Sequence, residues 1–147
     1  MKKVSKNIEY FITKMRVLLQ KHILVFNGIK VKYLFKSQQK SNDLVIIFSA
    51  FIRKGLKARF NYVRTLKDFS CNQLIILDDF GEDGRGGYFV AYEMNFQKKA
   101  ATKVLIQIMN QTNANRVMFC GSSIGGWAAL NFGLQYHNCT GCRGSEC

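Results

Sequence analysis

The residues best suited to chemistry are two serines flanked by glycines, in the motif GSSIG at positions 121–125. An apolar run at 117–120 predicts a buried strand before the motif, and residues 126–136 are expected to form a helix after it. In the pattern G-x-S-x-G the serine occupies a sharp, strained strand-to-helix turn, and the glycines let neighbouring backbone pass closely. The spacing therefore predicts Ser123 as a nucleophile.

The backbone beside Ser123 is suited to stabilising an oxyanion. The N–H of Ile124 would lie at the N-terminus of the predicted helix, where the helix dipole favours developing negative charge. An alternative is that this glycine-rich turn binds a phosphate group or simply reverses the chain. The motif leaves both interpretations open.

The elements around the motif alternate between strands and helices. Asn27-Gly28 predicts a tight hairpin turn between the first two strands. Four β-prone or apolar runs predict strands: residues 23–26, 29–35, 44–48 and 74–77. Two further segments favour helices: residues 56–68 and about 95–110. This alternation predicts an α/β fold, in which a hairpin leads into parallel strands with helices on both faces.

This order of elements, ending in the serine turn and its helix, resembles the N-terminal part of the α/β-hydrolase family over roughly residues 23–136. More narrowly, FSAF at 48–51, FNYVRTL at 60–66 and LDDFG at 77–81 are similar to stretches of two groups of bacterial proteins. The first are hydrolase-like proteins of capsular-polysaccharide biosynthesis, and the second are accessory-secretion proteins linked to glycan acetylation. The resemblance implies serine esterase or acyltransferase chemistry through Ser123 on a bacterial surface or capsular glycan.

The resemblance also implies a second oxyanion donor in the loop after the strand at 44–48, and the N–H of Phe51 is the candidate. The rest of the family's triad is not matched. An acid and then a histidine should follow the serine, but after Ser123 the chain has no Asp, one Glu (Glu146) and one His (His137). His137 would lie roughly 15 Å from the serine, at 1.5 Å per helical residue.

His22 precedes the first strand and is expected at the surface, so no base is assigned. Asp78 and Asp79 end a neighbouring strand and could face the site, but they cannot replace an imidazole. We therefore expect this chain to be inactive as it stands. The alternative is a non-catalytic interaction module or pseudoenzyme remnant on the same fold.

Residues 137–147 differ abruptly from the rest of the chain. They hold Cys139, Cys142 and Cys147 without apolar periodicity. A Cys-x-x-Cys pair can hold a metal or form a disulfide. The favoured interpretation is a tail foreign to the fold, from a frameshift or gene truncation, so no metal and no cofactor is expected. The expected organisation is a basic amphipathic helix at 1–22, the hydrolase-like part at 23–136, and this tail.

The net charge of +13 belongs to the first half of the chain: residues 1–72 hold 16 Lys/Arg and 3 Asp/Glu. The amphipathic helix at 1–22 either packs on the domain or lies on an anionic membrane or polymer. Basic residues at 53–67 flank two aromatic residues, but no nucleic-acid motif accompanies them. The expected partner is therefore an anionic glycan or glycolipid carrier rather than nucleic acid.

The longest apolar stretch, 44–52, is too short to span a membrane, and no signal-peptide pattern is present. Five cysteines, an odd number, favour reduced thiols. We therefore expect a cytoplasmic protein, with peripheral membrane contact through its basic half. Self-association is also expected, because the strand at 117–120 would leave an unpaired sheet edge.

Overall fold

The computed structural model describes residues 2–81, 83–87 and 95–137. In chain order its elements are α1 (Lys2–Gln20), β1 (Lys21–Phe26), β2 (Ile29–Lys36), β3 (Asp43–Phe48), β4 (Asn72–Leu77), α2 (Asn95–Thr112), β5 (Arg116–Gly121) and α3 (Ile124–His137). All five predicted strands and the helices predicted at 95–110 and 126–136 are present. Asn27 and Gly28 both have positive φ angles, as the predicted hairpin turn requires.

The strands form one sheet in the order β1-β2-β4-β3-β5. The hairpin strand β2 pairs antiparallel with β4, whereas β3 pairs parallel with both β4 and β5. Phe48 is in register with Ile76 on one side and Gly121 on the other, so the carboxyl ends of the three parallel strands lie in a row. The α/β class is confirmed. The predicted site residues follow the carboxyl ends of these parallel strands.

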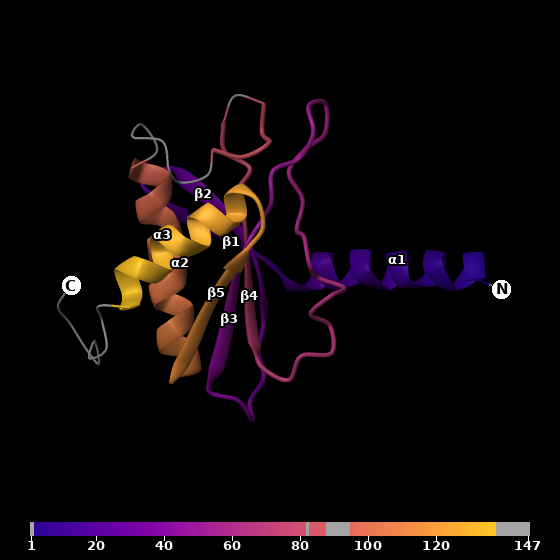
Figure 1. Cartoon of the computed structure of the whole chain (residues 1–147), viewed down its shortest axis with the longest axis horizontal. Coiled ribbons are helices and arrows are strands. Elements are labelled where there is room, and N and C mark those ends of the chain that lie inside the picture. The colour runs from indigo at the N-terminus through magenta and orange to yellow at the C-terminus, as the bar shows by residue number, and fades with distance from the viewer. Residues whose placement is uncertain (1, 82, 88–94, 138–147) are drawn as a thin grey trace.

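Helices α2 and α3 pack on the same face of the sheet (Figure 1) and cover the larger part of the core. The fully buried side chains there include Phe48 and Phe132, whose rings stack with centroids 5.0 Å apart. The opposite face has a smaller cluster around Leu34, Ile47 and Ile75, covered by the segment between β3 and β4 and by Val17 of α1.

The segment 56–68, for which a helix was expected, forms turns instead. Two long side chains from the sheet bind its carbonyl groups. Gln73 Nε2 donates to the carbonyl oxygens of Leu66 and Phe69 at 2.8 and 3.1 Å, and Lys36 Nζ donates to those of Lys67 and Phe69 at 3.0 and 3.3 Å. These hydrogen bonds satisfy carbonyl groups that would otherwise be bonded within a helix. The apolar residues of the segment recur only loosely at helical spacing, so they do not favour a helix strongly.

Helix α1 extends away from the sheet for most of its length (Figure 1). Its large apolar side chains are exposed, namely Ile8, Tyr10, Phe11, Ile12, Met15, Leu18 and Leu19. Apolar packing against the domain, one of the two interpretations of this helix, is therefore seen at Val17 near its C-terminal end, and an ion pair between Glu9 and Lys67 adds a polar contact. Among the described residues, no helix combines the length and the apolar character needed to cross a membrane.

Candidate functional site

Ser123 lies between the end of β5 and the start of α3, on the sharp turn that the motif predicts. Its φ angle is 53°, in the left-handed region that a non-glycine residue rarely adopts. Holding such a residue there costs about 1–3 kcal/mol, and residues of this kind cluster at functional sites. The strain thus falls on the residue predicted to be the nucleophile.

The two glycines of the motif are required by close backbone contacts. A Cβ on Gly121 would overlap the carbonyl oxygen of Gly125 and lie 2.7 Å from the nitrogen of Gly126. A Cβ on Gly125 would lie 2.7 Å from the carbonyl oxygens of both Phe48 and Ser49. The first turn of α3 therefore rests directly on the end of β3, and only glycine allows this approach.

The two predicted oxyanion donors belong to the two elements that meet at this contact: Ile124 starts α3, and Phe51 follows β3. Ile124 is the first residue of α3, so its N–H is among the four that have no acceptor within the helix. Phe51 lies three residues after β3, and the guanidinium of Arg85 is 4.6 Å from the centroid of its ring. The fold therefore brings the start of the Phe51 loop against the serine turn, and the role of the Phe51 N–H stays a prediction.

Tyr62 is a further residue at the turn, which sequence reasoning did not assign to the site. Its phenol hydrogen-bonds the hydroxyl of Ser122, 60 positions along the chain. Tyr62 also has a positive φ angle, 64°. A strained aromatic residue from the β3–β4 segment thus contacts the residue immediately before the candidate nucleophile. In the sequence, Tyr62 lies within the FNYVRTL stretch at 60–66, but this stretch has no recognised catalytic role that would have assigned Tyr62 to the site.

Asp78 and Asp79 directly follow the last residue of β4, at the edge of the sheet where the parallel strands have their carboxyl ends. The buried carboxylate of Asp78 accepts hydrogen bonds from the backbone N–H groups of Gly87 at 2.9 Å and Phe80 at 3.3 Å. Asp79 forms an ion pair with Lys32 of β2. These contacts give both carboxylates a structural role in ordering the loop after β4 and joining it to the hairpin.

Cys120 immediately precedes the motif, and its thiol contributes to packing. It lies against the smaller apolar cluster around Ile47. Burial raises the pKa of this thiol. The thiolate, which is the nucleophilic form, is thereby disfavoured at neutral pH, so Ser123 remains the better candidate nucleophile.

Neither histidine of the chain lies near Ser123. His22 is on β1, at the opposite edge of the sheet from β5, where its ring stacks on Tyr33 with centroids 5.3 Å apart. His137 ends α3, which has 14 residues, and at 1.5 Å per residue that end is roughly 20 Å from the turn. The helix between the motif and His137 is therefore present, and its length makes the separation somewhat larger than the roughly 15 Å expected from the sequence. Glu146 and the three cysteines of the predicted tail lie outside the described residues.

No protein-family model and no curated protein matches this chain, but solved structures do. It is similar to the capsule O-acetyltransferase of Neisseria meningitidis serogroup A. A mutant of that protein in complex with CoA is 30% identical with a TM-score of 0.63, and the match covers 80% of this chain and 47% of that one. The same acetyltransferase in complex with caged gadolinium is 28% identical with a TM-score of 0.61, over 81% and 52% of the two chains.

A membrane phospholipase A, described as a bacterial virulence factor, is 17% identical with a TM-score of 0.53, over 92% of this chain and 45% of that one. At this identity the match shows a shared fold. This chain spans about half the length of the solved structures it matches. The similarity to a capsule O-acetyltransferase supports the relation to capsular biosynthesis that the sequence stretches indicate.

Proposed function

We propose that this chain carries the nucleophile part of a serine acyltransferase or esterase site that acts on a bacterial surface glycan. The observation that carries the proposal is the strained Ser123 between β5 and α3. The similarity of the surrounding sheet to that of a capsule O-acetyltransferase supports the acyl chemistry and the class of acceptor.

In the proposed reaction the Ser123 Oγ attacks the carbonyl carbon of an acyl donor. The Oγ proton passes to a base, the oxyanion forms near the N–H of Ile124, and the bond to the leaving group breaks to give an acyl-serine. Attack by water or by a glycan hydroxyl then releases the acyl group and restores the serine. Phe51 is proposed as the second N–H donor, because its loop follows the strand on which the turn rests.

A second candidate function is a non-catalytic interaction module on the same fold. The positions of the two histidines favour it, since His22 is at the far edge of the sheet and His137 ends the helix that leaves the site. A serine hydroxyl without a positioned base is a weak nucleophile. Loss of one triad member costs on the order of 10⁴–10⁶ in turnover, so we expect the isolated chain to react very slowly.

Hydrolysis of an aryl acetate by the wild-type chain, Ser123→Ala and Ser122→Ala distinguishes the two functions. The second variant is a matched control, because it removes the neighbouring hydroxyl and leaves the candidate nucleophile. Turnover that is slow in the wild type, lowered but detectable in Ser122→Ala, which also loses the hydrogen bond with Tyr62, and abolished in Ser123→Ala supports acyl chemistry. Equal turnover in all three proteins favours the interaction module.

A further inference from the structure

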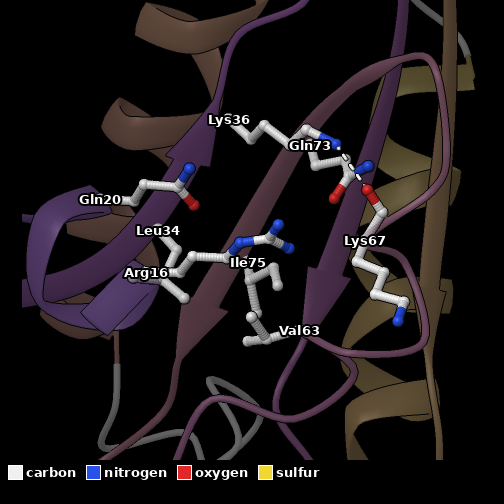
Figure 2. Close-up of a pocket in the computed structure, with 8 residues that line it drawn as sticks. All are labelled: Arg16, Gln20, Leu34, Lys36, Val63, Lys67, Gln73 and Ile75. Atoms are coloured by element: carbon white, nitrogen blue, oxygen red, sulfur yellow. Dashed lines mark hydrogen bonds between the residues drawn. The ribbon is translucent and has the colours of Figure 1, made fainter. Parts of the chain in front are cut away.

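A pocket of about 170 Å³ lies where the C-terminal end of α1 meets the sheet (Figure 2). It is lined by Arg16, Gln20, Leu34, Lys36, Val63, Lys67, Gln73 and Ile75. Gln73 is near the amino end of β4, whereas Ser123 follows the carboxyl end of β5. The pocket is therefore separate from the serine turn, and the proposed acyl chemistry does not use it.

The charged residues that line this pocket are all positive. Arg16, Lys36 and Lys67 come from three different parts of the chain, and none of the eight lining residues is acidic. Lys36 is held by the carbonyl oxygens of Lys67 and Phe69, and Lys67 Nζ lies 3.5 Å from Glu9 Oε1 at the rim. The guanidinium of Arg16 has no acidic partner among the residues that the structure describes.

The remaining lining groups suit an anion attached to a less polar body. The amides of Gln20 and Gln73 lie in the same pocket as the guanidinium of Arg16, while Leu34, Val63 and Ile75 supply apolar surface (Figure 2). A volume of 170 Å³ holds roughly five or six water molecules at about 30 Å³ each. That is room for a phosphate group and part of the group that carries it.

We propose that this pocket binds a phosphate ester, with Arg16 as the principal contact. Arginine presents paired donors that match two phosphate oxygens, and the two lysines add point charges. A ligand there would join α1, β2, β4 and the β3–β4 segment, which carries Tyr62 next to Val63. Binding should therefore stabilise the folded chain by mass action. The ligand is either a soluble sugar phosphate or the headgroup of an anionic lipid.

Isothermal titration with inorganic phosphate and with glucose 1-phosphate tests the soluble form of the ligand. We expect Arg16→Gln to weaken binding about tenfold, or about 1.4 kcal/mol, and Arg16→Lys to restore part of it. The matched control is Lys14→Gln, which removes one charge from the same helix outside the pocket. Because Lys14 does not line the pocket and its exposed charge is weakened by salt, this control should change the affinity by less than about twofold.

Co-sedimentation with phosphatidylcholine vesicles containing phosphatidic acid tests the lipid form with the same variants. Binding that depends on Arg16 and not on Lys14 supports the proposal. If it occurs in the titration, the ligand is a soluble phosphate ester, and if it occurs in the vesicle experiment, the ligand is a lipid headgroup. Absence of binding in both arms, or equal losses in the two glutamine variants, overturns it. Ser123→Ala should bind as the wild type does, so failure of the acyl chemistry and failure of this site remain distinguishable.

Discussion

The phenol of Tyr62 hydrogen-bonds the hydroxyl of Ser122, and this contact joins two strained segments. Tyr62 and Ser123 have φ angles of 64° and 53°, although neither is glycine. The β3–β4 segment is thereby fixed against the turn that carries the candidate nucleophile. The contact gives Tyr62 a positioning role, because it acts on Ser123 through the neighbouring serine.

Replacing Tyr62 with phenylalanine removes this hydrogen bond and keeps the ring. We expect Tyr62→Phe to lower the free energy of unfolding by about 0.5–1.5 kcal/mol, the net contribution of a typical hydrogen bond. Urea denaturation measures the change. The control is Tyr10→Phe on the exposed part of α1, and equal effects of the two substitutions would contradict the hydrogen bond between Tyr62 and Ser122.

Alanine at either glycine of the motif should be poorly tolerated. Gly121→Ala and Gly125→Ala each force a Cβ against backbone that cannot move independently, so we expect a loss of about 3 kcal/mol or more. Gly133→Ala is the control within α3, because its Cβ would lie 3.5 Å from the ring of Phe119, an ordinary contact. Thermal melts should show Gly133→Ala close to the wild type. Wild-type stability of Gly125→Ala would contradict the described turn.

An ion pair joins the first residues of the parallel strands β3 and β5, and its contribution to the stability of the fold depends on pH. Arg116 donates two hydrogen bonds to the carboxylate of Asp43, at 2.8 and 2.6 Å, and this contact lowers the pKa of Asp43. A lowered folded-state pKa gives stability that is present above the ordinary Asp pKa and lost as the pH falls through the folded value.

We therefore expect Asp43→Asn to be less stable than the wild type at pH 7. This difference should begin to shrink below about pH 3.9, the ordinary Asp value, and disappear once the pH is below the lowered folded-state pKa. Denaturation curves across the acid range measure it. The control is the exposed Asp68, whose change to Asn should leave the curve unaltered. A difference for Asp43→Asn that persists unchanged into strong acid would contradict the role of the pair.

Strand β5 forms one edge of the described sheet, and Met118 on it is 61% exposed. Unpaired strand edges with apolar side chains favour association between copies. We expect the apparent mass in sedimentation velocity to rise with protein concentration, and Met118→Lys to reduce this rise. Leu56→Lys, at an exposed position in the β3–β4 segment, is the control. A monomer at every concentration would contradict the expectation.

The sequence predicted the parts of this fold that depend on local pattern. Apolar runs marked the strands, Asn27-Gly28 marked the hairpin, and the glycines around Ser123 marked the strained turn. The turns at 56–68 depend on Lys36 and Gln73, which bind carbonyl groups of the segment from the sheet. No local periodicity contains that information.

The approach of Tyr62 to Ser122 was missed for a similar reason, because it follows from how the β3–β4 segment crosses the sheet. The amphipathic pattern of α1 predicted an apolar face and left open what covers it. The structure shows that most of this face is exposed, with Leu19 at 78%. Candidate catalytic residues could thus be identified individually from the sequence, whereas the residues that contact them could be identified only from the fold.

The most direct test of the serine site is site-resolved labelling with a fluorophosphonate, with and without added imidazole. The turn and the N–H of Ile124 should be formed while no histidine of the described residues lies beside Ser123, so free imidazole should accelerate labelling by acting as the base. Peptide mass spectrometry should place the label on Ser123, with the acceleration kept in Ser122→Ala and lost in Ser123→Ala. Labelling that imidazole does not accelerate, or that falls on Ser122, would contradict the proposed nucleophile.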